Sequence, residues 1–176
     1  MAKEANLLVT FDPTHLESAK TEIANLLKKV KEEANVLKAE EGLAEVVVKD
    51  AKKAIKELAG IAKKDVAQFA HTFQWVPIEK WCKATVVDMK KNIKGFVKDI
   101  GKDEKWKMDL KTRRVKEKTD EIKLILKLTE VVDRQKVDLK NPEKTIKVEI
   151  IGNKAGLALL GKDELLNIAK LKEQAK

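Results

Sequence analysis

Apolar residues along the first 77 positions recur with alternating strand and helix periods. After Thr14 they are spaced three or four apart, which predicts a helix, with Thr14 and Glu17 as its capping box. The predicted elements are a strand at 6–12, a helix within 12–33, two strands within 35–49, a helix after Asp50 and a strand at 67–77. This order is the split β-α-β-β-α-β pattern of a ferredoxin-like fold.

The rest of the chain predicts a second α/β part with a mixed sheet. Its predicted elements are a helical turn at 78–82, a helix from Thr85 to Gly101, a strand at 105–116, a helix at 119–133, strands at 144–151 and 155–160, and a helix at 163–173. The helix at 119–133 is apolar on most sides, which predicts deep burial. We therefore expect an α+β protein in which a ferredoxin-like domain (1–70) packs rigidly on a second domain (71–162), followed by a C-terminal helix (163–176).

Charge is distributed unevenly between the two parts. The chain has 38 Lys and Arg against 29 Asp and Glu, a net charge of +9. Residues 1–65 contain twelve of each sign, so the whole excess belongs to residues 66–176. Such asymmetry favours a polyanionic partner for the C-terminal part. The alternative is a lysine-rich surface that only keeps the protein in solution.

Motifs of common enzyme classes are missing from the sequence. The chain contains no glycine-rich phosphate loop and no nucleophile elbow, and it has seven glycines in total. One cysteine (Cys82) and two histidines (His15 and His71) are too few for a structural zinc site, and Cys82 lies in an apolar stretch typical of inert cysteines. We expect no catalytic residue, metal or cofactor. With no apolar run of membrane-spanning length and no signal peptide, a cytoplasmic location is expected.

The strongest candidate for a binding site is the stretch "KWKMDLKTRRVK" at 105–116. Trp106, Met108 and Leu110 alternate with basic residues, as in a strand with one buried face and one positive face. The basic series continues toward the next helix, whose N-terminus is a natural seat for phosphate. The candidate RNA-binding residues are Lys105, Lys107, Lys111, Arg113, Arg114, Lys116, Lys118, Lys140, Asn141 and Lys144.

Few aromatic residues accompany these cations. There is no tyrosine, and the three tryptophans are interpreted as core residues, so stacking on unpaired bases is not expected. Recognition of a folded RNA by its backbone fits better than reading of its sequence. Alternation places Arg113 and Arg114 on opposite faces, which favours Arg113 as the contact residue. The alternative for both arginines is pairing with Glu117 and Glu121.

The stretch "KVDLKNPEKTIKVEIIGNKAGLAL" resembles the THUMP domain, an RNA-binding module of tRNA-modifying enzymes that follows a ferredoxin-like domain. The resemblance rests on Val137-Asp138-Leu139, Asn141-Pro142 and the strand at 146–150. It implies that Lys111, Arg113, Arg114, Asn141 and Lys144 contact tRNA. A structural alternative is that Asp138, Asn141 and Pro142 only shape the loop.

Family members usually join THUMP to a methyltransferase, a thiouridine synthetase or a pseudouridine synthase, and none fits after residue 160. The chain is similar to the stand-alone THUMP adaptors of tRNA acetylation. This resemblance implies a non-catalytic adaptor that presents tRNA to a separate RNA acetyltransferase for N4-acetylcytidine formation, with no membrane or DNA partner. The alternatives are an RNA-binding subunit of another tRNA-modifying enzyme, such as a methyltransferase or thiouridine synthetase, and a protein-interaction scaffold.

Overall fold

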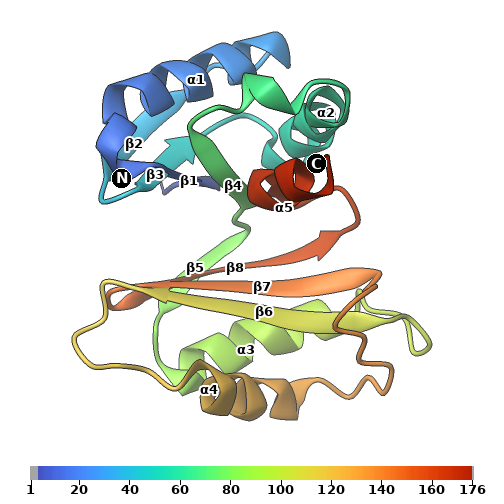
Figure 1. Ribbon diagram of the computed structural model, residues 1–176. Coiled ribbons are helices and arrows are strands. Elements are labelled where there is room, and N and C mark those ends of the chain that lie inside the picture. Colours follow the sequence, from blue (N-terminus) through green and yellow to red (C-terminus); the bar gives the residue numbers. More distant parts are fainter. Residues whose placement is uncertain (1–3, 176) are drawn as a thin grey trace. The chain divides into compact units, whose positions relative to one another are not determined.

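The computed structural model describes residues 4–175 and divides into two compact units (Figure 1). Unit 1 runs to Ile78 and also includes the C-terminal residues from Asp163, whereas unit 2 is Glu79–Lys162. The expected ranges assigned residues 71–78 to the second domain and the last 14 residues to a separate helix. Both segments belong to unit 1, because residues 72–77 and residues 166–167 pair within its sheet.

Unit 1 contains one antiparallel sheet with helices. Its elements are β1 (Leu7–Phe11), η1 (Pro13–His15), α1 (Leu16–Lys29), β2 (Asn35–Glu40), β3 (Leu43–Val47), α2 (Ala51–Lys64), η2 (Val66–Gln68), β4 (Thr72–Pro77), β9 (Leu166–Asn167) and α5 (Ile168–Gln174). The strand order is β2-β3-β1-β4-β9, with β1 paired antiparallel to both β3 and β4. The four strands and two α-helices from β1 to β4 thus follow the predicted ferredoxin-like pattern. Strand β9 extends the sheet beyond β4.

The apolar stripes of α1 and α2 form the core of unit 1 with the sheet. Ile23 and Leu27 of α1 and Ile55 and Leu58 of α2 are fully buried in one cluster with Trp75 of β4. Three-four spacing brings such residues to one face of each helix, where their burial drives folding.

The start of α1 differs from the predicted capping box. Asp12, not Thr14, is the capping residue: its carboxylate accepts hydrogen bonds from the backbone N–H and the hydroxyl of Thr14 and begins η1. These bonds, with one to His15, lower the pKa of Asp12 to about 2. The short η1 turn displaces the start of the α-helix to Leu16, with no side-chain cap at His15.

Unit 2 is a four-stranded mixed sheet with two α-helices. Its elements are β5 (Lys80–Lys83), α3 (Val86–Val97), β6 (Trp106–Arg113), α4 (Glu121–Leu128), η3 (Thr129–Val131), β7 (Lys144–Ile151) and β8 (Lys154–Gly161). The strand order is β5-β8-β7-β6, in which β6 and β7 are parallel and the other pairs antiparallel. The predicted mixed sheet is confirmed.

Both α-helices of unit 2 cover the same face of its sheet (Figure 1). Met89 and Ile93 of α3 and Leu128 of α4 pack in one cluster with Met108 and Leu110 of β6. Alternation along β6 therefore has the predicted consequence, with Trp106, Met108 and Leu110 buried under the helices.

Two predictions for unit 2 are wrong. Residues 80–83 form the edge strand β5, because they pair with 154–157 of β8, and not a helical turn. Helix α4 is shorter than predicted and is not deeply buried, since Leu128 is its one fully buried residue. Within the described residues, none of the helices has both the length and the apolar character needed to cross a membrane.

Candidate nucleic-acid interface

Strand register gathers basic residues on the face of the second sheet opposite its two helices. One row across the sheet pairs Trp81 with Gly156, Gly156 with Glu149 and Glu149 with Lys111. The next row pairs Lys83 with Lys154, Lys154 with Ile151 and Ile151 with Arg113. Because side chains alternate between faces, residues of both rows lie on the face opposite Cys82 and Leu110, which belong to the helix-covered core. We call Trp81, Lys83, Lys111, Arg113 and Lys154 the basic corner.

The basic corner combines an aromatic ring with several cations. The Nζ of Lys154 lies 4.6 Å from the centre of the Trp81 ring, a cation–π contact. Lys83 is exposed and stands directly opposite Lys154 on the neighbouring strand. The two lysines therefore bring positive charge together on one row of the sheet.

Trp81 overturns the prediction that all three tryptophans are core residues. Trp75 and Trp106 are buried as expected, whereas Trp81 is half-buried. Its partly exposed indole could stack on a base or a ribose while the lysines contact phosphate. The prediction missed Trp81, Lys83 and Lys154, and the signal was available, because "KWCK" read as a strand places Trp81 and Lys83 on one face.

Arg113 is held by an acidic residue within the fold. Its Nε lies 3.6 Å from Oε2 of Glu149, which is neither Glu117 nor Glu121, the two acids named as alternatives. Glu149 also contacts Lys147 at 3.0 Å, and Lys147 contacts Asp109 at 3.2 Å. Lys147 and Glu149 are each only 2% exposed, so these four side chains form a balanced, largely buried charge network. The charge of Arg113 is therefore mainly compensated, and Lys111 is the exposed cation beside it.

The other predicted residues, apart from Lys107, lie at the two ends of β6. Lys105 precedes this strand, eight residues and about 26 Å along the chain from Arg113. With Lys105 at the start of β6 lie Lys140, Asn141 and Lys144. Beyond its end lie Arg114, Lys116 and Lys118, while Lys107 lies between, on the face of Lys111. The structure does not bring the ten predicted residues together at one point.

Residues at the start of β6 mainly shape the fold. The Asp138 carboxylate accepts hydrogen bonds from the backbone N–H groups of Asn141 and Lys140, at 2.9 and 3.0 Å. These two bonds lower the pKa of Asp138. Lys105 lies 3.8 Å from the same carboxylate, and the Nζ of Lys144 donates to the carbonyl of Asp99. The structural alternative for the loop is thus supported for Asp138, while the Asn141 side chain is exposed.

The N-terminus of α4 differs from the phosphate seat that the sequence suggested. Asp120 caps it, with its carboxylate accepting from the backbone N–H of Lys123 at 3.1 Å. Glu121 follows in the first turn and accepts from the backbone N–H of Thr112. Two carboxylates at this helix end repel a phosphate.

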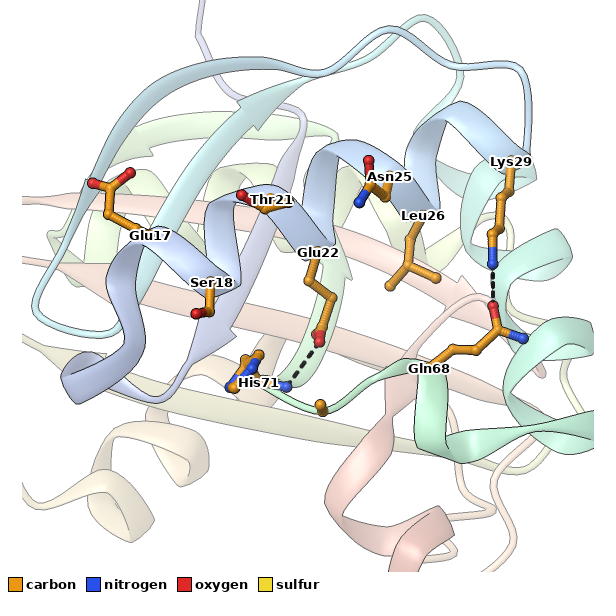
Figure 2. Close-up of a pocket in the computed structure, with 10 residues that line it drawn as sticks. Glu17, Ser18, Thr21, Glu22, Asn25, Leu26, Lys29, Gln68 and His71 are labelled. Atoms are coloured by element: carbon orange, nitrogen blue, oxygen red, sulfur yellow. Dashed lines mark hydrogen bonds between the residues drawn. The ribbon is translucent and has the colours of Figure 1, made fainter.

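A separate pocket in unit 1, of about 590 Å³, lies between α1 and the segment 68–71 (Figure 2). The Glu22 carboxylate points to the end of β4 and accepts from the backbone N–H groups of His71 and Thr72, both at 2.9 Å. Lys29 donates to the Gln68 side chain at the other end. The bonds of Glu22 hold the backbone in place where β4 begins. All residues that line the pocket belong to unit 1, so the pocket is not part of the basic corner.

Comparisons with known proteins identify part of the chain. The family model of the THUMP domain matches residues 83–160. No curated protein matches the sequence. Similar solved structures include PH1313 from Pyrococcus horikoshii Ot3, with 15% sequence identity and a TM-score of 0.57, covering 92% of this chain and 54% of that one.

Two further solved structures share the fold. TrmN from Thermus thermophilus is 16% identical with a TM-score of 0.56, covering 87% of this chain and 44% of its own. A possible methylase from Clostridium difficile 630 is 15% identical with a TM-score of 0.54, covering 89% and 41%. The chain thus spans about half the length of these proteins or less. The match to the THUMP domain model covers somewhat less than half of the chain, residues 83–160.

Proposed function

We propose that this protein is a non-catalytic tRNA-binding adaptor that presents tRNA to a separate RNA acetyltransferase for N4-acetylcytidine formation in the cytoplasm. The observation that carries the binding role is the location of the charge. Unit 2, which contains the THUMP domain, has 23 basic and 14 acidic residues, whereas unit 1 has 15 of each. The entire net charge of +9 therefore belongs to the unit with the RNA-binding type of domain.

The basic corner is the part of unit 2 that we assign to tRNA contact. Lys83 and Lys111 supply exposed charges for phosphate oxygens, and Trp81 supplies a ring for stacking. Contacts of this kind depend on backbone charge and shape, and they suit a folded RNA bound without a strict sequence requirement.

The non-catalytic assignment is supported by the one thiol of the chain. Burial raises the pKa of Cys82, with a further contribution from the nearby charge of Asp88, so the protein contains little of the nucleophilic thiolate at neutral pH. In the unit 1 pocket, Glu22 is bonded to the backbone of His71 and Thr72, and Lys29 is bonded to Gln68. Both observations fit a protein that binds RNA and leaves the chemistry to a partner.

A second function is supported by a specific comparison. The possible methylase from Clostridium difficile shares this fold, and this chain covers 41% of it. The chain would then be the RNA-binding part of a methyltransferase or another tRNA-modifying enzyme, such as a thiouridine synthetase. A protein-interaction scaffold without RNA binding is the third candidate.

Two measurements separate the three candidates. Filter binding of purified protein to unmodified tRNA is expected to show saturable binding that weakens steeply with salt, and its absence would leave only the scaffold. Deletion of the gene, followed by mass spectrometry of tRNA nucleosides, is expected to remove N4-acetylcytidine. Loss of a methylated or thiolated nucleoside instead would establish the second function and refute the adaptor role in acetylation.

A further inference from the structure

Helix α4 has more apolar side chains than are buried in the core of unit 2. Five of its eight residues, in "EIKLILKL", are Ile or Leu, yet only Leu128 is fully buried. Ile122 is 73% exposed and Leu126 is 64% exposed. Because these two residues are four positions apart, they lie on one face and form a continuous apolar row.

A basic row runs beside the apolar one. Lys123 and Lys127 are also four positions apart, each following one member of the apolar pair, and both are exposed. Within the described residues, neither lysine forms an ion pair. Helix α4 therefore presents two parallel rows, one apolar and one positive, with no part of the described chain over Ile122 or Leu126.

We propose that this face of α4 is the docking surface for the enzyme to which the protein presents tRNA. Its occupant would be an amphipathic helix of that enzyme, with an apolar row bordered by Asp or Glu. Such a helix covers Ile122 and Leu126 while its carboxylates meet Lys123 and Lys127, as apolar and flanking charged positions do in paired helices. The inference rests on the proposed function, because it gives the adaptor its contact with the catalytic partner.

The chemistry of the two rows favours a protein over the other occupants. The surface of a folded RNA is dominated by charged phosphates and hydroxylated riboses, which gain little from Ile122 or Leu126, whereas aliphatic side chains of a protein bury this area favourably. A second copy of the chain would add its own lysine row and another unit with a charge of +9. Repulsion between the copies opposes that arrangement.

The position of α4 allows both partners to bind at once. The helix lies on the covered face of the second sheet (Figure 1). Strand register and alternation place the basic corner on the opposite face of the same sheet. An enzyme on α4 therefore leaves Trp81 and Lys111 available to tRNA.

Two double variants of the full chain test the docking surface. Ile122→Ser with Leu126→Ser removes the apolar row, and Lys123→Glu with Lys127→Glu reverses the basic row. The matched controls are Leu139→Ser, at a leucine that is 71% exposed in a loop, and Lys91→Glu with Lys94→Glu on the exposed side of α3. Circular dichroism and thermal melting confirm that each variant is folded.

Biolayer interferometry then measures binding of each variant to purified enzymes from the same organism. The enzymes are the RNA acetyltransferase and tRNA methyltransferases and thiouridine-forming enzymes that lack a THUMP domain, and tRNA binding is measured in parallel. We expect both α4 variants to weaken acetyltransferase binding about tenfold or more and the controls to change it less than about twofold. The serine variants should keep the tRNA affinity of the wild type. The two charge-reversed variants should equal each other in tRNA affinity, because each changes the net charge by the same amount.

Each other outcome has one interpretation. Enzyme binding that the α4 variants leave intact would refute the docking surface and leave the adaptor role standing. Binding through α4 to a methyltransferase or thiouridine-forming enzyme instead would keep the docking surface and refute the acetylation role. No binding to any of these enzymes would refute both. A loss of tRNA affinity in an α4 variant that exceeds the loss in its matched control would reassign the face to RNA.

Discussion

Arg113 and Lys111 point to the same side of β6 but have different surroundings. Arg113 faces the buried carboxylate of Glu149, and the two facing atoms, Nε and Oε2, form no hydrogen bond within the described residues. In Arg113→Ala the buried Glu149 would retain only Lys147 as a partner. We expect the free energy of unfolding to fall by about 1–3 kcal/mol in urea denaturation, because a buried charge loses part of its compensation. Lys111→Ala is the control and should change stability by less than about 0.5 kcal/mol. Equal stability of the two variants would show that Arg113 does not support Glu149.

Asp138, in the loop before β7, makes the stability of the fold depend on pH. Hydrogen bonds from the backbone of Asn141 and Lys140 lower its pKa in the folded state, so the folded protein favours the ionised form. The resulting stabilisation is complete above the unfolded pKa, near 3.9, and is lost as the pH falls through the lower folded pKa. Asp138→Asn should therefore have a lower Tm than the wild type at pH 7, and the difference should shrink toward pH 3. Thermal melts across this range measure it, and a difference independent of pH would contradict the assignment.

At the scale of elements, the sequence predicted those helices and strands that have a long apolar pattern of their own. Helices α1 and α2 and strands β6 and β7 carry long apolar patterns, and all four were predicted close to their positions. Strands β5 and β9 are short, and they exist because distant segments, β8 and β4, pair with them. The exposure of α4 was missed for a related reason, since periodicity gives the apolar face of a helix but not the area that neighbours cover.

The same limit applied to the candidate site. Lys111 and Arg113 were found because the charge run on β6 is visible in the chain. Lys83 and Lys154 are 71 residues apart, and only the pairing of β5 with β8 brings them together. The buried partner of Arg113 was also unpredictable from local spacing, because Glu149 comes from the neighbouring parallel strand.

Substitution of Trp81, on β5, tests whether the basic corner binds tRNA by stacking. Trp81→Ala removes the ring on which a base can stack, and stacking contributes about 1–3 kcal/mol per base. We expect tRNA affinity to fall at least about fivefold in filter binding, and Trp81→Phe to retain most of it, because a phenyl ring still stacks. Unchanged affinity in Trp81→Ala, with the fold intact by circular dichroism, would exclude a stacking role for this residue.

At the scale of the whole molecule, the uneven charge predicts an uneven effect of lysine substitution. Lys83→Ala with Lys111→Ala removes two exposed cations from unit 2, and Lys20→Ala with Lys28→Ala removes two exposed cations from unit 1. Both double variants change the net charge equally, so a general effect of charge on tRNA affinity is the same for both. Each lost phosphate contact lowers the slope of log affinity against log salt by about 0.7–0.9. We therefore expect the slope to fall by about 1.4–1.8 for the unit 2 variant and to change little for the unit 1 variant, in filter binding from 50 to about 200 mM salt. Equal slopes for the two variants would place tRNA contact outside the basic corner, because each pair of lysines would then contribute only its share of the net charge.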